Sequence, residues 1–301
     1  MFRFILSILI AILYLIITLP VLFVLWIMHK KHPGRAEKIT SAMIRWIFGV
    51  LTSAAGTKVT VIGQEKIPKD TPVLYIGNHR SIYDIIISYQ YLPGITGYVA
   101  KDTLGRIPLF SLWAKYVTCL FFNRSDPKSG LSMIRDAVAH IRGGKSVFIF
   151  PEGTRNKQEE DLPLLPFHEG SLRIASMAHV PIVPVAQNNT VNIWEAHFPR
   201  VHAAHTVIEF CDPINPEDIP KEERKHLGVK AGGIMTDAIG RNRDLLRYPP
   251  KGSGFNVFEH GDLTVRTHLF VLLHIADDPV HNRNSVNQSA QKQADFFSVP
   301  D

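Results

Sequence analysis

The stretch Val73–Asp84 decides the fold and has the sequence VLYIGNHRSIYD. Its first four residues form an apolar run of the kind that is buried as a strand, and residues 82–92 have the length of a helix. A strand that turns directly into a helix is the building unit of α/β proteins. Such proteins present side chains to ligands at these turns, so the turn after this strand is a candidate functional site.

His79 and Asp84 are the residues of this turn that suggest catalysis. Histidine is the side chain best able to take a proton near neutral pH, and a carboxylate beside it fixes its tautomer and stabilises the imidazolium. The five-residue spacing suits such a pair if His79 lies in the turn and Asp84 in the first turn of the following helix. A structural alternative stays open, because Ser81 followed by Asp84 also fits a capping box at the start of that helix.

Positive charge is concentrated at the N-terminal end. The 301 residues have a net charge of +6, and residues 1–60 hold seven basic side chains and one acidic side chain, whereas the rest of the chain is balanced. This charge flanks the most apolar part of the sequence, which favours an anionic membrane surface over nucleic acid. Cys119 and Cys211 have no metal-ligand spacing, so we expect structural thiols in a reducing compartment.

The segment Phe4–Met28 contains no charged residue. It is long enough to span a bilayer with some tilt, but Pro20 equally allows a kinked or re-entrant helix. The basic cluster at 29–35 predicts that the C-terminal side of this segment lies in the cytoplasm. Apolar residues at helical spacing over 39–51 fit either core packing or a helix in the membrane interface.

From residue 58 the pattern changes to alternating strands and helices. Apolar runs predict strands at Val59–Ile62, Val73–Ile76, Gly97–Ala100, Leu120–Asn123, Val147–Phe150, Ile182–Val185 and Val207–Phe210. Helices are predicted at Ile82–Leu92, Phe110–Tyr116, Lys128–Arg142 and Ser171–Ala178, with a last helical segment from Pro216 to about Leu246. The alternation predicts an α/β fold with a largely parallel or mixed central sheet flanked by helices. The predicted divisions are membrane-associated anchor helices (1–57), the α/β domain (58–247) and an atypical tail (248–301).

Charged side chains follow two further predicted strands. Arg124 comes directly after the fourth strand, and the block Glu152–Arg155, EGTR, follows the fifth. Arginine presents a planar fork of donors that matches phosphate oxygens. Gly153 lets the backbone approach a ligand closely, and Glu152 can accept a hydrogen bond from a hydroxyl. For either segment alone, a solvated surface turn is the alternative.

Four blocks together make the sequence specific. They are N-H-x4-D at 78–84, F-x-N-R at 121–124, F-P-E-G-T-R at 150–155 and V-P-I-V-P-V at 180–185. In this order and spacing they resemble the glycerolipid acyltransferases, and most closely the bacterial-type 1-acyl-sn-glycerol-3-phosphate acyltransferases. The resemblance covers roughly residues 1–245. The chain departs from it at His168-Glu169, where members often have a lysine, and after about Leu246, where it has no counterpart.

The resemblance implies a function. It implies transfer of a fatty acyl group from acyl-CoA or acyl-carrier protein to the sn-2 hydroxyl of lysophosphatidic acid, giving phosphatidic acid, with no metal or other cofactor. It also implies that His79 is the general base and that Asp84 holds its other nitrogen. The residues expected to bind the acceptor are Lys101, Arg124, Glu152, Gly153, Thr154 and Arg155. The protein would work among membrane phospholipids, with its catalytic domain on the cytoplasmic face.

Two alternatives remain at this point. The acceptor could instead be glycerol-3-phosphate or another lysolipid, because the four blocks do not define the acceptor or acyl-chain pocket. In a different class, the chain could be a catalytically idle membrane scaffold that keeps the fold. The intact His79, Asp84, Glu152 and Arg155 argue against the scaffold.

Overall fold

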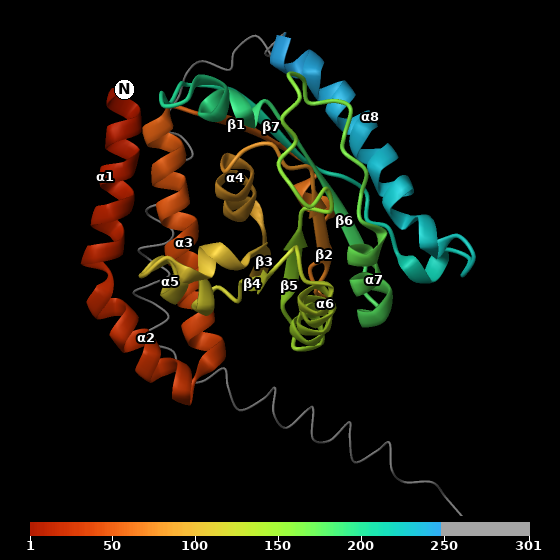
Figure 1. Ribbon diagram of the computed structural model, residues 1–301, viewed down its shortest axis with the longest axis horizontal. Coiled ribbons are helices and arrows are strands. Elements are labelled where there is room, and N and C mark those ends of the chain that lie inside the picture. The colour runs from red at the N-terminus through yellow and green to blue at the C-terminus, as the bar shows by residue number, and fades with distance from the viewer. Residues whose placement is uncertain (248–301) are drawn as a thin grey trace, which may run out of the picture. The chain divides into compact units, whose positions relative to one another are not determined.

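The computed structural model describes residues 1–247 of the chain, and the predicted tail lies outside them. Within these residues, seven strands form one sheet in the order β1-β7-β6-β2-β5-β3-β4 (Figure 1). The strands are β1 (Lys58–Ile62), β2 (Leu74–Gly77), β3 (Thr96–Lys101), β4 (Leu120–Phe122), β5 (Ser146–Ile149), β6 (Ile182–Asn188) and β7 (His205–Phe210). Each overlaps one of the predicted runs.

Strand direction makes the sheet mixed. The pairs β6–β2, β2–β5, β5–β3 and β3–β4 are parallel, and β6–β7 is antiparallel. Because β1 pairs with β7 in parallel, both of these strands run opposite to the other five. The predicted α/β class with a parallel or mixed sheet is confirmed.

The helices of the described residues are α1 (Phe2–Ile17), α2 (Leu19–Lys31), α3 (Pro33–Ala55), α4 (Tyr83–Tyr91), α5 (Phe110–Tyr116), α6 (Pro127–Arg142), α7 (Glu169–Ala178) and α8 (Leu227–Arg247). They cover the two faces of the sheet in two groups (Figure 1). On one face, Ile47 of α3 and Ile87 of α4 share a core with Phe148 of β5. On the other face, Met133 of α6 and Leu172 of α7 share a second core with side chains of α8.

This arrangement places a crevice between β2 and β5. These strands are parallel neighbours, but β2 leads into α4 on one face, whereas the next helix after β5 is α7 on the other face. Ligands bind at such switch points, outside the carboxyl ends of parallel strands. His79 follows β2 and the EGTR block follows β5, so the topology brings the two predicted segments to one crevice.

The apolar run Phe4–Met28 forms two helices, with a break at Thr18. Pro20 lies in the first turn of α2, where its missing N–H costs no helical hydrogen bond, and the hydroxyl of Thr18 donates to the carbonyl oxygen of Tyr14. No single helix within residues 1–247 is long and apolar enough to cross a membrane. Among the helices of these described residues, α1 and α2 together have that length and composition, and the pair is bent by 50°. The kink that Pro20 allowed is therefore present.

The N-terminal helices also belong to the protein core. Tyr14 of α1 and Ile44 and Ile47 of α3 are part of the cluster that covers the sheet. Trp46, on the same helix as Ile47, is 40% exposed. Core packing, one of the two alternatives for residues 39–51, therefore holds for the inner side of α3. Residues 1–57 and the sheet share one hydrophobic core.

Candidate active site

Asn78 fixes the turn that follows β2. Its side-chain amide donates to the carbonyl oxygen of Gln187, and its side-chain oxygen accepts from the Gln187 amide, both at 2.8 Å. Gln187 belongs to the neighbouring strand β6, so the turn is tied to the sheet. Gly77 is needed just before it, because a Cβ there would lie 2.8 Å from the ring of Phe148.

The predicted pair of His79 and Asp84 is present. Nδ1 of His79 lies 2.9 Å from Oδ2 of Asp84, which is fully buried in the first turn of α4. The carboxylate therefore fixes the proton of His79 on Nδ1 and leaves Nε2 for a ligand. The same Oδ2 accepts from the backbone amides of Arg80 at 2.6 Å and Ser81 at 2.7 Å. Asp84 thus caps the helix and holds the histidine at once, so the two alternatives from sequence coexist.

A buried glutamate supports the histidine from the loop after β5. Oε1 of Glu152 accepts from the backbone amide of His79 at 2.8 Å, and Oε2 accepts from that of Leu165 at 3.0 Å. Burial raises the pKa of Glu152, and these two amides oppose the rise. Because both oxygens bind backbone and Glu152 is outside the pocket wall, the structure places it as a support of the turn. The expected part of Glu152 in binding the acceptor stays a prediction.

Further bonds close this loop over the turn. The Asn156 amide donates to the carbonyl oxygen of His79 at 2.6 Å. The buried guanidinium of Arg80 pairs with Asp161 at 2.6 Å. The ring of His79 stacks on Phe150, with centroids 4.1 Å apart and planes 19° from parallel. The imidazole is therefore held on several sides before any ligand binds.

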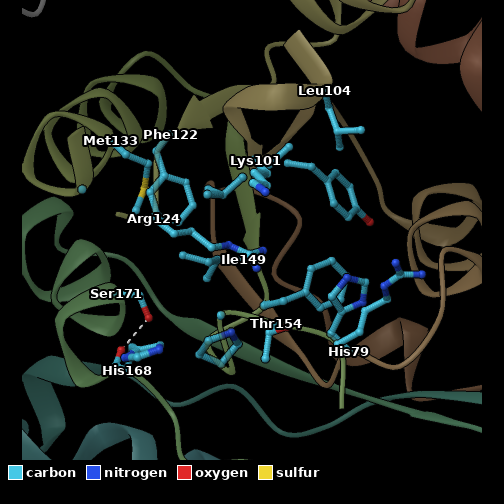
Figure 2. A pocket seen from close by; sticks show the side chains of 18 of the residues that line it. His79, Lys101, Leu104, Phe122, Arg124, Met133, Ile149, Thr154, His168 and Ser171 are labelled. Atoms are coloured by element: carbon cyan, nitrogen blue, oxygen red, sulfur yellow. Dashed lines mark hydrogen bonds between the residues drawn. The ribbon is translucent and has the colours of Figure 1, made fainter. Parts of the chain in front are cut away.

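A pocket of about 620 Å³ opens beside His79 (Figure 2). The predicted site residues that line it are His79, Lys101, Arg124, Gly153, Thr154 and Arg155. Its apolar wall includes Tyr98, Leu104, Phe122, Met133, Ile149 and Phe150. The pocket therefore joins an apolar wall to basic groups beside a histidine, a combination that suits an amphiphile with an anionic head.

The arginines occupy different settings at this pocket. Arg155 is 49% exposed, and its guanidinium donates to Glu195 at 3.1 Å. Arg124 extends into the pocket (Figure 2), where desolvation lowers its pKa. Gly153 has a φ of 69°, and a Cβ there would lie 2.8 Å from Nε2 of His168. Glycine is thus required at this position by the backbone and by His168 together.

Two supporting residues were not found from sequence. Glu195 accepts from the Ser81 hydroxyl at 2.6 Å and the Ile82 amide at 2.8 Å, in addition to Arg155. Thr190 donates its hydroxyl to Oδ1 of Asp84. Both lie more than one hundred residues from the turn in a segment without a regular pattern. The sequence holds no local signal for either role.

The sequence of this chain is similar to those of known acyltransferases. Residues 58–188 match the family described as Acyltransferase. A 1-acyl-sn-glycerol-3-phosphate acyltransferase of Haemophilus influenzae is 31% identical over 201 residues, which cover 65% of this chain and 79% of the relative. The chain belongs to the 1-acyl-sn-glycerol-3-phosphate acyltransferase family.

Other members of the 1-acyl-sn-glycerol-3-phosphate acyltransferase family agree. The protein of that name from Cocos nucifera is 31% identical over 209 residues, 69% of this chain and 64% of the relative. The solved structure of the 1-acyl-sn-glycerophosphate (LPA) acyltransferase PlsC from Thermotoga maritima has the same fold. It superposes with a TM-score of 0.68 at 23% identity, over 80% of this chain and 95% of that chain.

Thr190 offers a test of how Asp84 is held. Thr190→Val keeps the shape of the buried side chain but removes the donor to Oδ1 of Asp84. A hydrogen bond to a charged group such as this carboxylate contributes about 1.5–3 kcal/mol, so we expect kcat to fall by at most roughly ten- to a hundredfold with the acceptor KM unchanged. Thr190→Ser restores the donor and should restore the rate. Full rate in Thr190→Val together with a loss in Thr190→Ser would show that the methyl group, and not the hydroxyl, is needed.

Proposed function

We propose that the protein transfers a fatty acyl group from acyl-CoA or acyl-carrier protein to the sn-2 hydroxyl of lysophosphatidic acid. The products are phosphatidic acid and the free thiol of the donor. The observation that carries the proposal is His79 at the pocket wall, with Nδ1 held by the buried Asp84. The names of the related acyltransferases support the same reaction.

His79 acts as the general base in this reaction. Its Nε2 takes the proton of the acceptor hydroxyl, while the oxygen forms a bond to the carbonyl carbon of the thioester. The Asp84 carboxylate stabilises the imidazolium that results. When the tetrahedral intermediate collapses, the C–S bond breaks, and the thiolate takes the proton back from His79. No acyl-enzyme is formed, and the sequence contains no Gly-x-Ser-x-Gly nucleophile motif.

The pocket wall suits the two ends of lysophosphatidic acid. Arg124, Arg155 and Lys101 supply positive charge for the phosphate, and the apolar wall takes an acyl chain. These groups suit an acceptor that has both a phosphate and a chain, and glycerol-3-phosphate is distinguished from it by the assay below. Other lysolipids with an anionic head are the second candidate, because the basic groups do not distinguish among them.

The activity is tested with a panel of acceptors. Membranes containing the protein are supplied with labelled acyl-CoA or acyl-carrier protein and with lysophosphatidic acid, glycerol-3-phosphate or another lysolipid, and each product is identified by mass. Membranes containing His79→Ala give the background. Phosphatidic acid formed above this background is the expected result. If product forms only from a different acceptor, that acceptor is the substrate in place of lysophosphatidic acid. If no acceptor gives product, the result favours the catalytically idle scaffold.

The outer side of α1 and α2 suits a membrane. Exposed apolar side chains cover it: Phe2, Ile5, Ile8, Leu9, Ile12, Leu13, Ile16, Leu19, Phe23, Val24, Trp26 and Ile27. Monomeric soluble proteins rarely expose so large a group of apolar side chains, and Lys30 and Lys31 follow at the end of α2. The proposal therefore includes seating of this bent pair in a phospholipid membrane, with the catalytic domain on the cytoplasmic face.

This seating predicts how the protein is extracted. Leu9, Ile12 and Ile16 are exposed on α1, so changing all three to serine leaves the core packing in place but removes apolar area from the lipid. We expect the full chain to sediment with membranes in high salt and the triple variant to appear severalfold more in the supernatant. The control replaces Leu131, Met177 and Val229, exposed apolar residues of α6, α7 and α8. Equal release of both variants would contradict seating through α1.

A further inference from the structure

The loop 194–202 lies against the N-terminal end of α1 (Figure 1). Trp194 stacks on Phe4 of α1, with ring centroids 6.0 Å apart and planes 24° from parallel. Phe198 also packs against Trp194, with ring centroids 5.7 Å apart. It is nevertheless 70% exposed. An aromatic side chain of this size at the surface leaves most of its apolar area in water.

The exposed ring continues an apolar region of α1. Phe2 and Ile5 lie close to Phe4 in the same helix and are 77% and 59% exposed. Because Phe4 and Trp194 join the two segments, Phe198 extends the apolar outer side of α1 beyond the helix. This contact connects parts of the chain that are about 190 residues apart.

Basic side chains accompany this aromatic loop. Residues 196–204 contain Arg200, His197 and His202 and no acidic side chain. The rings of His197 and His202 lie 4.2 Å apart. Desolvation and the neighbouring charges of His197, Arg200 and Arg3 of α1 lower the pKa of His202, so the permanent positive charge at this loop is that of the two arginines. The acid at the start of the loop, Glu195, is engaged by the turn after β2.

We propose that the loop 194–202 is a second lipid-contacting element, which places Phe198 in the interface of an anionic membrane beside α1. The proposal rests on the membrane seating of α1 and α2 proposed above. Aromatic rings favour the membrane interface, and basic residues near it are attracted by anionic headgroups. The loop offers both, next to a helix whose outer side is apolar.

The position of this loop bears on the active site. Glu195 directly follows Trp194 in the chain, and its carboxylate holds both Arg155 and the start of α4. A loop seated on headgroups therefore places Arg155 next to the headgroup layer, where the phosphate of a lysolipid lies. The element that contacts lipid and the residue proposed to bind phosphate are linked through one carboxylate.

Photo-crosslinking tests the proposal with the full chain. The photoreactive amino acid p-benzoylphenylalanine replaces Phe198, or Ile12 of α1, or Val229 of α8, in separate variants. Ile12 reports seating of α1, and Val229, 71% exposed on a helix at the other face of the sheet, is matched to Phe198 in exposure. Each protein is reconstituted with mixed vesicles of phosphatidylcholine and phosphatidylglycerol and irradiated, and adducts are identified by mass.

We expect lipid adducts at positions 12 and 198 and none at 229. At 198, Arg200→Gln should lower the yield of phosphatidylglycerol adducts about fivefold, the change expected for one basic residue at an anionic surface. Adducts at 12 without adducts at 198 would overturn the proposal and leave the seating of α1 intact. Adducts of 198 to a second copy of the chain would also overturn it. The absence of adducts at 12 would contradict the membrane seating of α1, on which the proposal rests, and would overturn it as well.

The acyltransferase activity is measured separately. Acylation of lysophosphatidic acid dispersed in detergent reports the reaction without a bilayer. A protein that is active in detergent but gives no lipid adduct at 198 would contradict this inference and leave the proposed reaction unaffected. Adducts at 198 in a protein that shows no acyl transfer would support the inference and count against the reaction alone.

Discussion

His79→Ala lowers kcat by about 10²–10⁴, the range expected when a general base is removed, and leaves the acceptor KM little changed. His79 is at the pocket wall, and within residues 1–247 its ring makes the Asp84 bond and the stack on Phe150. The fold should therefore survive its removal. The measurement is steady-state kinetics with lysophosphatidic acid, with a thermal melt to show that the variant is folded. A variant with full activity would rule out His79 as the base.

Asp84→Asn should lower kcat less than His79→Ala does, because the base itself is kept. The side-chain oxygen of asparagine can remain where Oδ2 lies, because that position accepts from Nδ1 of His79 and from two backbone amides. The tautomer of the histidine and the helix cap are then kept. The negative charge beside the imidazolium is lost, and the amide nitrogen that replaces Oδ1 cannot accept from the Thr190 hydroxyl. A hydrogen bond to a charged group is worth about 1.5–3 kcal/mol, so we expect kcat to fall roughly ten- to a hundredfold.

The double variant decides whether the two residues act together. Residues that act as a unit are not additive, so His79→Ala with Asp84→Asn should be scarcely slower than His79→Ala alone. Multiplication of the two single effects would mean that Asp84 serves only the helix start. Thermal melts of all four proteins separate loss of rate from loss of folding.

Replacing Arg155 by lysine should raise the KM for lysophosphatidic acid roughly ten- to a hundredfold. Lysine keeps the charge but loses the planar fork that matches phosphate oxygens, and one hydrogen bond between charged groups is worth about 1.5–3 kcal/mol. Arg155 is held by Glu195 at a single nitrogen, so the rest of its fork is available to a ligand. The measurement is KM for acceptor and donor in parallel.

A matched variant controls for loss of any arginine. Arg135→Lys changes an exposed arginine of α6 that does not line the pocket beside His79, and both KM values should stay as they are. Arg124→Lys, which alters the arginine inside that pocket, should behave as Arg155→Lys does. A raised donor KM with an unchanged acceptor KM would assign these arginines to the thioester substrate instead.

The strands and the pairing of His79 with Asp84 could be predicted because their signals are local. Each strand is a short apolar run between turn residues, and His79 and Asp84 lie five residues apart in one turn. The order of the strands could not be predicted in the same way. The reversal begins at the antiparallel pair β6–β7, and β1 shares it because it pairs in parallel with β7. That second pairing joins segments about 145 residues apart, such as Lys58 with His205, and no local pattern encodes such pairing.

The role of Glu152 shows the same limit within the site. Its place in the EGTR block suggested a contact with substrate, but its oxygens accept the amides of His79 and Leu165. Backbone donors are present at nearly every residue, so the sequence does not show which of them a carboxylate will meet. Thr190 and Glu195 were missed for the complementary reason, since their partners are far away in the chain.

The sharing of α1 between core and surface has a thermodynamic consequence. Tyr14 on its inner side packs against Trp113 of α5, with ring centroids 5.4 Å apart, while its outer side is apolar and exposed. By mass action, an amphiphile that binds this folded outer side more tightly than the unfolded chain raises the free energy of unfolding. The melting temperature therefore depends on the amphiphile concentration. A surfactant added to keep the protein dispersed also acts as a ligand of the folded state.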